Sequence, residues 1–283
     1  MATFTNRATL SYSGRTTDSN VVTGTLAETL SVTKTPLAGT YSAGGNVTYV
    51  IGLVNSGTVP YVDLTVTDDL GTYTVGEQTF APLQYLEGSI LYYVNGILQT
   101  APTVEDTQPL TVSGIRVPAG GNAVLVYDTV LTGFAPLSEG GSVVNTATVT
   151  GAGLTAPLEA SATVLAASRA ELTITKSLSP TVVPENGTIT YTFEIRNFGS
   201  APAVATDDVT VTDTFDPILS DLTVTYEGAA WSEGANYTYD PATGLFQTVP
   251  SQITVPAATF TQGPDGQWTV EPGLVTLTVT GTL

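Results

Sequence analysis

The sequence contains no cysteine and no histidine, and these two absences exclude several classes of function. Without cysteine there are no disulfides, thiolate metal sites or cysteine nucleophiles. Without histidine, the commonest general base and metal ligand is missing. The sequence also has no glycine-rich phosphate loop and no nucleophile elbow. We therefore expect a protein that is not an enzyme with turnover and that holds no cofactor and no metal.

Basic residues are scarce: 7 lysines and arginines stand against 25 acidic residues, giving a net charge of −18. A protein that binds phosphates needs clustered lysine and arginine, so nucleic acid and anionic membranes are not expected partners. The simplest explanation for the excess of acidic residues is that the negative charge keeps the protein soluble. No apolar run is long enough to span a membrane, and no basic region followed by an apolar core begins the chain. A membrane span and a secretory signal are therefore not expected.

Threonine, valine and glycine are abundant, and 17 prolines are spread along the 283 residues. This composition favours many short strands joined by turns, and an apolar content of 42% is enough for a core. No segment has a long helical period. The chain is therefore expected to be all-β.

An internal repeat divides the chain into two copies. "LSVTKTPLAG" begins at Leu30 and "LTITKSLSPT" at Leu172, and matching residues continue downstream of both. The matches are Lys34 with Lys176, Tyr49 with Tyr191, Asn55 with Asn197, and Asp68 with Asp213. Alternating apolar residues between turns such as "AGG", "ENG" and "NSG" predict antiparallel β-sandwiches of immunoglobulin type. We assign residues 29–168 to the first sandwich and residues 169–283 to the second.

The second copy has no counterpart of "VVNTATVTG", in which Val143, Asn145, Ala147 and Val149 share one face. A similar strand, "ATFTNRATLSY", lies instead near the N-terminus, within residues 1–28. Because the side-chain period of a strand is two, one face of that strand combines an amide with apolar groups. The residues of this face are Phe4, Asn6, Ala8, Leu10 and Tyr12. We expect the second sandwich to lack its last strand and Thr3–Tyr12 to act as a donor strand.

Strand parity also directs polar side chains into each core. In the first copy these residues are Lys34, Asp68 and Asn145. In the second copy they are Lys176 and Asp213, and the only equivalent of Asn145 is Asn6 in the N-terminal strand. A buried lysine and aspartate are costly unless they are paired. One interpretation is an ion pair bonded to an asparagine amide. The sharper one is an isopeptide bond, in which a desolvated neutral lysine attacks the asparagine carbonyl and the aspartate carries the proton.

The pattern of Lys34, "TY", "N-x-G", "VTD" and "NTATVT" resembles the bacterial repeat family called domain of unknown function 11. The resemblance covers essentially the whole chain as two copies. It implies immunoglobulin-like modules of cell-surface, fimbrial or spore-surface proteins, and some members are similar to isopeptide-forming domains of Gram-positive pilins and adhesins. The size and layout also look like filamentous spore-appendage subunits of Gram-positive anaerobes. An extracellular location on a cell or spore surface follows from the resemblance.

The resemblance also implies roles for individual residues. Asp68 and Asp213 would be catalysts of one turnover, and Lys34 and Asn145 would be joined within a subunit. Lys176 would have no acceptor in its own domain. The offset matches and strand parity, and not the resemblance, suggest that a donated strand would bring Asn6 of another subunit to Lys176.

Several arrangements remain open from the sequence. A donated strand would join copies of this chain head to tail into a linear or helical homopolymer. The strand could instead fold back onto the second sandwich of its own chain, but this would need the connecting segment to be almost fully extended. Donation of a hairpin extending to residue 26 is also possible. The alternative is a monomeric adhesin or glycan-binding module, using aromatic residues within 85–96 and 231–246, although such residues more often pack cores. The acidic residues Asp207, Asp208, Asp213 and Asp216 lack calcium-loop spacing and are expected to form a solvated face.

Overall fold

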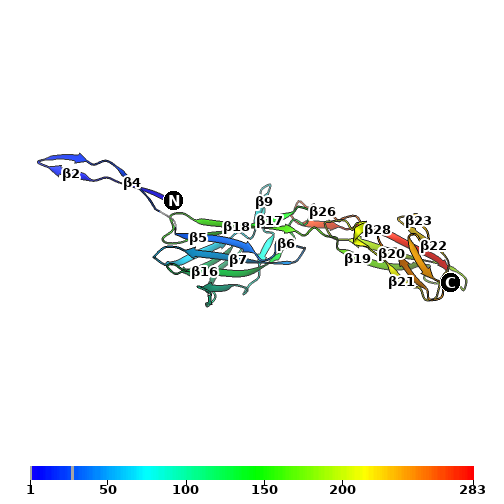
Figure 1. Cartoon of the computed structure of the whole chain (residues 1–283). Coiled ribbons are helices and arrows are strands. Elements are labelled where there is room, and N and C mark those ends of the chain that lie inside the picture. The colour runs from blue at the N-terminus through cyan, green and yellow to red at the C-terminus, as the bar shows by residue number, and fades with distance from the viewer. Residues whose placement is uncertain (1, 27–28) are drawn as a thin grey trace. The chain divides into compact units, whose positions relative to one another are not determined.

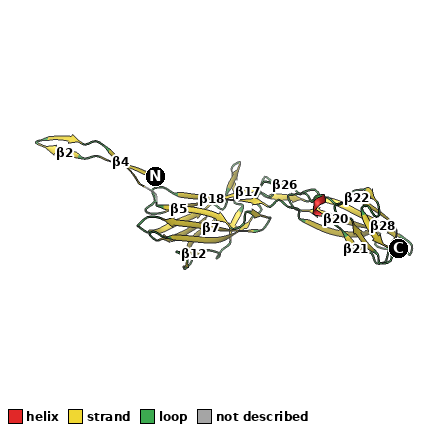
Figure 2. Cartoon of the chain, viewed as in Figure 1, coloured by secondary structure: helices red, strands yellow, loops and turns green. Residues whose placement is uncertain are grey.

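A computed structural model describes residues 2–26 and 29–283 of the chain, without the side chains of Ala2 and Leu26. The chain divides into two compact units: Met1–Pro136 with Ser142–Leu165, and Leu137–Gly141 with Ala166–Leu283. Strands make up both units, and the one helical turn among the described residues is a short 3-10 turn, η1 (Ala205–Asp207) (Figure 2). The all-β prediction is confirmed. Within the described part of the chain, no helix has the length and apolar character needed to cross a membrane.

The first unit is a sandwich of two sheets (Figure 1). One sheet has the order β13-β12-β16-β7-β5, with β11 also pairing β16, and the other has the order β14-β15-β8-β17-β18-β6. The strands of this unit are β5 (Leu30–Pro36), β6 (Thr40–Tyr41), β7 (Asn46–Asn55), β8 (Tyr61–Asp68), β9 (Tyr73–Val75), β10 (Gln78–Phe80), β11 (Leu83–Tyr85), β12 (Leu91–Val94), β13 (Ile97–Leu98), β14 (Thr103–Thr107), β15 (Leu110–Val117), β16 (Asn122–Leu131), β17 (Ser142–Thr150) and β18 (Leu158–Ala166).

Burial alternates along the central strands of the first unit, as the sequence period predicts. Along β7, the side chains of Val47, Tyr49, Ile51 and Leu53 are buried and those between them are less so. Strand β17 alternates in the same way. Each strand thus lines the core with one face and meets solvent with the other. This parity places the polar residues of the candidate site inside the sandwich.

The second unit has a five-strand sheet of order β19-β20-β28-β22-β23 and a smaller sheet of order β21-β25-β24. The register shows which strands correspond to those of the first unit, because Asp213 pairs with Phe246 as Asp68 pairs with Leu110. Strands β21, β25 and β24 therefore correspond to β8, β15 and β14. The strands of this unit are β19 (Leu172–Ser179), β20 (Thr188–Asn197), β21 (Thr212–Thr214), β22 (Ser220–Tyr226), β23 (Ala229–Trp231), β24 (Tyr237–Asp240), β25 (Leu245–Thr248), β26 (Thr259–Gln262), β27 (Trp268–Glu271) and β28 (Gly273–Thr282).

The matched residues Asn55 and Asn197 hold the same loop in both units. Asn55 Nδ2 donates to the carbonyls of Val59 (2.8 Å) and Pro118 (3.0 Å), and its Oδ1 accepts from the Gly57 amide. Asn197 repeats the pattern with the carbonyls of Ala201 (2.8 Å) and Pro256 (3.0 Å) and the Gly199 amide. A buried amide that satisfies several backbone groups fixes the loop geometry. The sequence repeat is therefore a repeat of structure.

The N-terminal segment folds as a hairpin of four short strands, drawn in blue in Figure 1: β1 (Ala2–Asn6), β2 (Thr9–Tyr12), β3 (Arg15–Asp18) and β4 (Val22–Leu26). β1 pairs with β4, and β2 with β3. Ser13 and Gly14, with φ of 46° and 75°, form the two-residue turn that such a hairpin favours. The expected continuous strand Thr3–Tyr12 is thus interrupted after Asn6. Residues 7–8 separate β1 from β2, whereas residues 19–21 separate β3 from β4, so one side of the hairpin has one extra residue at this point.

Candidate functional site

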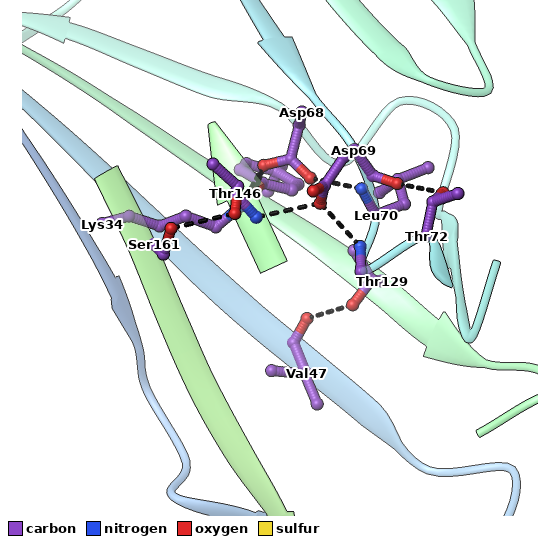
Figure 3. Close-up of polar contacts among 11 residues, drawn as sticks. Lys34, Val47, Asp68, Asp69, Leu70, Thr72, Thr129, Thr146 and Ser161 are labelled. Carbon is purple, nitrogen blue, oxygen red and sulfur yellow. Dashed lines mark hydrogen bonds and ion pairs between the residues drawn. The ribbon is translucent and has the colours of Figure 1, made fainter. Parts of the chain in front are cut away.

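The first-unit site is built around an ion pair between Lys34 and Asp68. Lys34 lies on β5 and Asp68 is the last residue of β8, so the pair joins the two sheets. The Lys34 Nζ donates to Asp68 Oδ2 in the cluster drawn in Figure 3. The two side chains are 0% and 1% exposed. Two buried charges persist only when they are paired and hydrogen-bonded. The geometry meets that requirement for both groups.

Two further donors complete the coordination of the Asp68 carboxylate. Tyr127 on β16 donates its hydroxyl to the same Oδ2 that accepts from Lys34. The Leu70 amide donates to Oδ1 at 3.0 Å (Figure 3). The neighbouring Asp69 Oδ1 accepts from the Thr146 amide at 2.9 Å, which ties the end of β8 to β17. The carboxylate is thus held in one position, beside the strand that carries Asn145.

Asn145 is fully buried within this site. It lies on β17, two residues before Ala147, which pairs directly with Asp68, and β17 also packs against β5. The Asn145 amide is close enough to the hydroxyls of Tyr49 and Tyr127 to lower their pKa values. Neither its Oδ1 nor its Nδ2 makes a hydrogen bond of standard geometry with any described residue, and the same holds for the Tyr49 hydroxyl. An unsatisfied buried polar group costs about 1–3 kcal/mol, so this amide requires an explanation.

Burial changes the titration of the groups around Asn145. Desolvation lowers the pKa of Lys34 from its ordinary 10.5, and the attraction of Asp68 opposes that shift without reversing it. Desolvation raises the pKa values of Tyr49 and Tyr127 by more than the amide lowers them, so both hydroxyls keep their protons. The Lys34 Nζ lies 4.8 Å from the Tyr49 ring centroid and 5.9 Å from that of Tyr127, and the two rings stack at 5.9 Å. Burial thus makes the neutral amine of Lys34 easier to form than that of an exposed lysine, next to two protonated hydroxyls.

The second unit has the equivalent lysine and aspartate, but their side chains are more exposed to solvent. The Lys176 Nζ donates to Asp213 Oδ2 and lies 4.5 Å from the Tyr191 ring and 5.3 Å from the Phe215 ring. The two side chains are 39% and 18% exposed. Tyr191 pairs with Val279 across strands β20 and β28, where Tyr49 pairs with Tyr127 in the first unit. The position that corresponds to Tyr127 is therefore held by a valine, which has no hydroxyl to offer.

The apolar row beside Lys176 is exposed as well. Leu172 is 37% and Ile174 is 53% exposed, whereas Leu30, the counterpart of Leu172, is 3% exposed. Among the described residues, β21 pairs with β25 and has no partner on its other edge, where β8 pairs with β17. The second unit thus has an open edge and an uncovered core face on the side where its lysine lies.

Asn6, the proposed acceptor for Lys176, lies at the end of β1 and is exposed, as are the other residues of the expected donor face, Phe4, Ala8, Leu10 and Tyr12. Within the single described chain, Asn6 pairs with Val22 of the same hairpin. The chain therefore does not bring Asn6 and Lys176 together through any described contact.

Two other groups singled out from sequence have structural roles. In the aromatic stretches, Tyr85, Tyr92, Tyr237 and Phe246 are buried in the cores. In the acidic group, Asp207 accepts from the Val204 amide at 2.8 Å, Asp208 accepts from the Ser251 hydroxyl at 2.6 Å, and Asp213 binds Lys176. Across the described residues, no cluster of acidic side chains has the geometry of a metal site.

The two tyrosines of the first site are functional candidates that sequence reasoning missed. The sequence marks Tyr49 only as a repeated residue and does not distinguish Tyr127, although both lie on inward positions of alternating strands. The usable signal was the inward parity of "AVLVYDTVLTG", which places the Tyr127 hydroxyl in the core.

No family model and no curated protein matches the chain, so the likeness to domain of unknown function 11 remains a resemblance. Solved structures of low similarity include BcpA, the major pilin subunit of Bacillus cereus, at 14% identity and a TM-score of 0.36, over 96% of this chain and 73% of that one. The pilus backbone RrgB of Streptococcus pneumoniae has 12% identity and a TM-score of 0.35, over 86% of this chain and 55% of that one. The collagen-binding subdomain of the Enterococcus faecalis surface protein ACE has 10% identity and a TM-score of 0.32, over 47% of this chain and 95% of that one. At these values the chain is similar to such β-domains only in general, and the likeness carries no argument about what it does.

Proposed function

We propose that this protein is the structural subunit of an extracellular or spore-surface filament, in which the N-terminal segment Thr3–Tyr12 of one copy completes the second unit of the next. The observation that carries the proposal is the uncovered row of Leu172 and Ile174 beside the open edge of β21. An unpaired strand edge with an exposed apolar face is a template for another strand. Each subunit carries both a donor and an acceptor, so the contact is head to tail and generates a filament.

We also propose that the two lysines form isopeptide bonds, Lys34 with Asn145 inside a subunit and Lys176 with Asn6 between subunits. The neutral lysine amine attacks the asparagine Cγ, the new C–N bond forms, and the amide nitrogen leaves as ammonia. Asp68 or Asp213 takes the proton from Nζ and delivers it to the leaving nitrogen, so no proton is gained or lost overall. The unsatisfied Asn145 amide supports this role, because conversion to the secondary amide removes its Nδ2.

Tyr49 and Tyr127 fit the same chemistry in the first unit in different roles. The Tyr49 hydroxyl lies beside the Asn145 amide, where negative charge develops on Oδ1 during the attack, and the Tyr127 hydroxyl, whose one proton goes to Asp68 Oδ2, holds the carboxylate in place. Donors aimed at a developing oxyanion in a dry site lower the barrier. The fixed positions of the lysine and asparagine supply the effective concentration for a reaction that each site performs once.

The test is the behaviour of the full chain after boiling in denaturant, read on a denaturing gel. Wild type is expected to give a ladder of covalent multimers, and Lys176→Ala or Asn6→Ala is expected to reduce it to the monomer. Thr175→Ala and Asn20→Ala, which change residues on the same strand and the same hairpin, should keep the ladder. A wild-type protein that stays monomeric before denaturation would contradict the filament. Filaments that dissolve fully in denaturant would contradict only the covalent link.

A further inference from the structure

We propose that the donated element is the whole N-terminal hairpin, with β1 and β4 entering the neighbour together and taking the two places that β17 and β18 occupy in the first unit. This inference rests on the proposed function and makes its donor specific. It identifies the acceptor surface as wide enough for two strands and its occupant as residues 2–26 of a second copy.

The pairing inside the hairpin repeats the pairing of β17 with β18. Asn145 lies opposite Ala162, and Val143 lies opposite Val164. In the hairpin, Asn6 lies opposite Val22, and Phe4 lies opposite Gly24. Directly opposed residues of an antiparallel pair share a face, so each hairpin presents one amide among apolar groups from both strands. The second strand of each hairpin therefore contributes to the same face as the asparagine.

The side-chain volumes of the two hairpins also match when both strands are counted. A Cβ added at Gly24 would lie 2.3 Å from the Phe4 ring, so the ring occupies the space above the glycine. A large and a small residue, Phe4 with Gly24, thus stand where two medium residues, Val143 with Val164, stand in the first unit. Cores tolerate exchanges that conserve volume. Phe4 fits the acceptor as part of this pair, and β1 alone would not provide the glycine beneath it.

The hydrogen-bonding edges are arranged as the acceptor requires. β17 uses one edge for β18 and the other for β8. The residues of β17 that pair with β8 are Ala147–Thr150, and with Asn6 aligned to Asn145 they correspond to residues 8–11. The edge that would meet β21 of a neighbour therefore belongs mainly to β2, which pairs only with β3 among the described strands. The hairpin can therefore dock without breaking its own pairing, whereas entry of β1 alone would break the whole β1–β4 ladder and expose its backbone groups.

The acceptor has room for the second strand. In the first unit, β18 lies between β17 and β6, and the Leu165 amide donates to the Gly39 carbonyl at 3.0 Å. The counterpart of β6 in the second unit, by the offset of the repeat, is the segment 182–183, which pairs with no described strand. Nearby Leu178 on β19 is 41% exposed. β4 of a neighbour placed here would give this segment a partner strand.

The first experiment compares Val22→Asp with the matched variant Thr23→Asp in the full chain. Val22 shares the face of Asn6, and Thr23 points to the opposite face of the same strand. Loss of filaments in Val22→Asp with retention in Thr23→Asp, measured by sedimentation and negative-stain microscopy, is the expected result. Filaments of Val22→Asp equal to wild type would overturn the inference and leave donation of β1 standing. Absence of filaments in wild type would instead overturn the proposed function.

The second experiment locks the hairpin with a disulfide. Thr5 and Thr23 lie directly opposite on the outer face, and the chain has no other cysteine, so Thr5→Cys with Thr23→Cys can form one defined bond. The oxidised protein is expected to assemble to the same extent as the reduced protein. Assembly that occurs only after reduction would overturn the inference, because it would show that β1 must leave β4 to enter the neighbour.

Discussion

Lys176 contacts Asp213 with 39% of the lysine side chain still exposed, although the equivalent contact of Lys34 with Asp68 is completely buried. The residues of the two pairs are the same, and the strands that carry them correspond. The difference lies in the cover, because β17 and β18 lie over the first pair and no described strand occupies that place over the second. The two units thus contain the same lysine–aspartate pair, with two covering strands in the first unit and without them in the second.

The proposed bond inside the first unit is expected to change the mass of the chain. In an Asn6→Ala background, which prevents the link between subunits, the intact protein should be lighter than its sequence by one ammonia. Lys34→Met should restore the full mass because it removes the attacking amine. Lys176→Met, the matched control at the only other lysine, should keep the deficit. A full mass in the Asn6→Ala protein would show that the first site contains only an ion pair.

Tyr127→Phe tests the hydroxyl that the sequence did not reveal. Its loss removes one of three donors to the Asp68 carboxylate. A hydrogen bond to a charged group contributes about 1.5–3 kcal/mol, so the free energy of unfolding should fall by that amount when Asn145→Ala prevents the covalent bond. Bond formation should also slow in the Asn145 protein. Urea denaturation and timed mass spectrometry measure the two effects. Tyr93→Phe, a half-buried tyrosine on β12, is the control and should change neither.

The stability of the uncrosslinked first unit should depend on pH through Lys34. Burial lowers its pKa in the folded state below the ordinary 10.5, so the unfolded state binds more protons between the two values. Stability therefore rises with pH across that window, by at most about 1.4 kcal/mol per unit. The measurement is urea denaturation of the Asn145→Ala protein relative to the double variant Lys34→Met with Asn145→Ala, at pH values rising to 10.5. Ionisation of the tyrosines is common to both proteins and cancels in the difference. A difference that does not change with pH would contradict the lowered pKa.

Ile174→Glu tests the uncovered face of the second unit. Ile174 is 53% exposed, so the isolated subunit should lose little stability, within about 0.5 kcal/mol. In a filament the residue would be covered, and an unpaired charge there is costly, so assembly should fail. Thr175→Glu, which points to the other face of β19, should assemble normally. Normal filaments of Ile174→Glu would show that this row is not the acceptor.

The fold followed from the sequence because its two determinants are local. The two-residue period of strands such as "NVTYVIGLVN" fixes which side chains enter the core, and the glycine- and asparagine-containing turns fix where strands end. The same parity placed Lys34, Asp68 and Asn145 in one buried cluster. Their positions are therefore those expected from sequence, and their roles in bond formation stay predictions.

What the sequence did not supply depends on contacts between distant strands. The hydrogen bond from Tyr127 to Asp68 joins residues on different sheets, and no local pattern encodes it. The break of the N-terminal strand after Asn6 depends on a one-residue mismatch between the two sides of the hairpin, which is visible only once Tyr12 is known to face Arg15. The exposure of Ile174 follows from the strand that is missing above it, so its own apolar neighbours could not reveal it.

The position of Lys34 and Asn145 has a consequence for how the first unit carries load. β5 is the first strand of the sandwich, and β17 precedes its last strand along the chain. With the proposed bond in place, a pull on the two ends would pass from β5 through the side chains of Lys34 and Asn145 into β17. Residues 35–144 would lie in a closed loop beside this path and bear no tension. The first unit would then transmit force along one short covalent path, and the part of its core that lies inside the closed loop would not be pulled apart by extension.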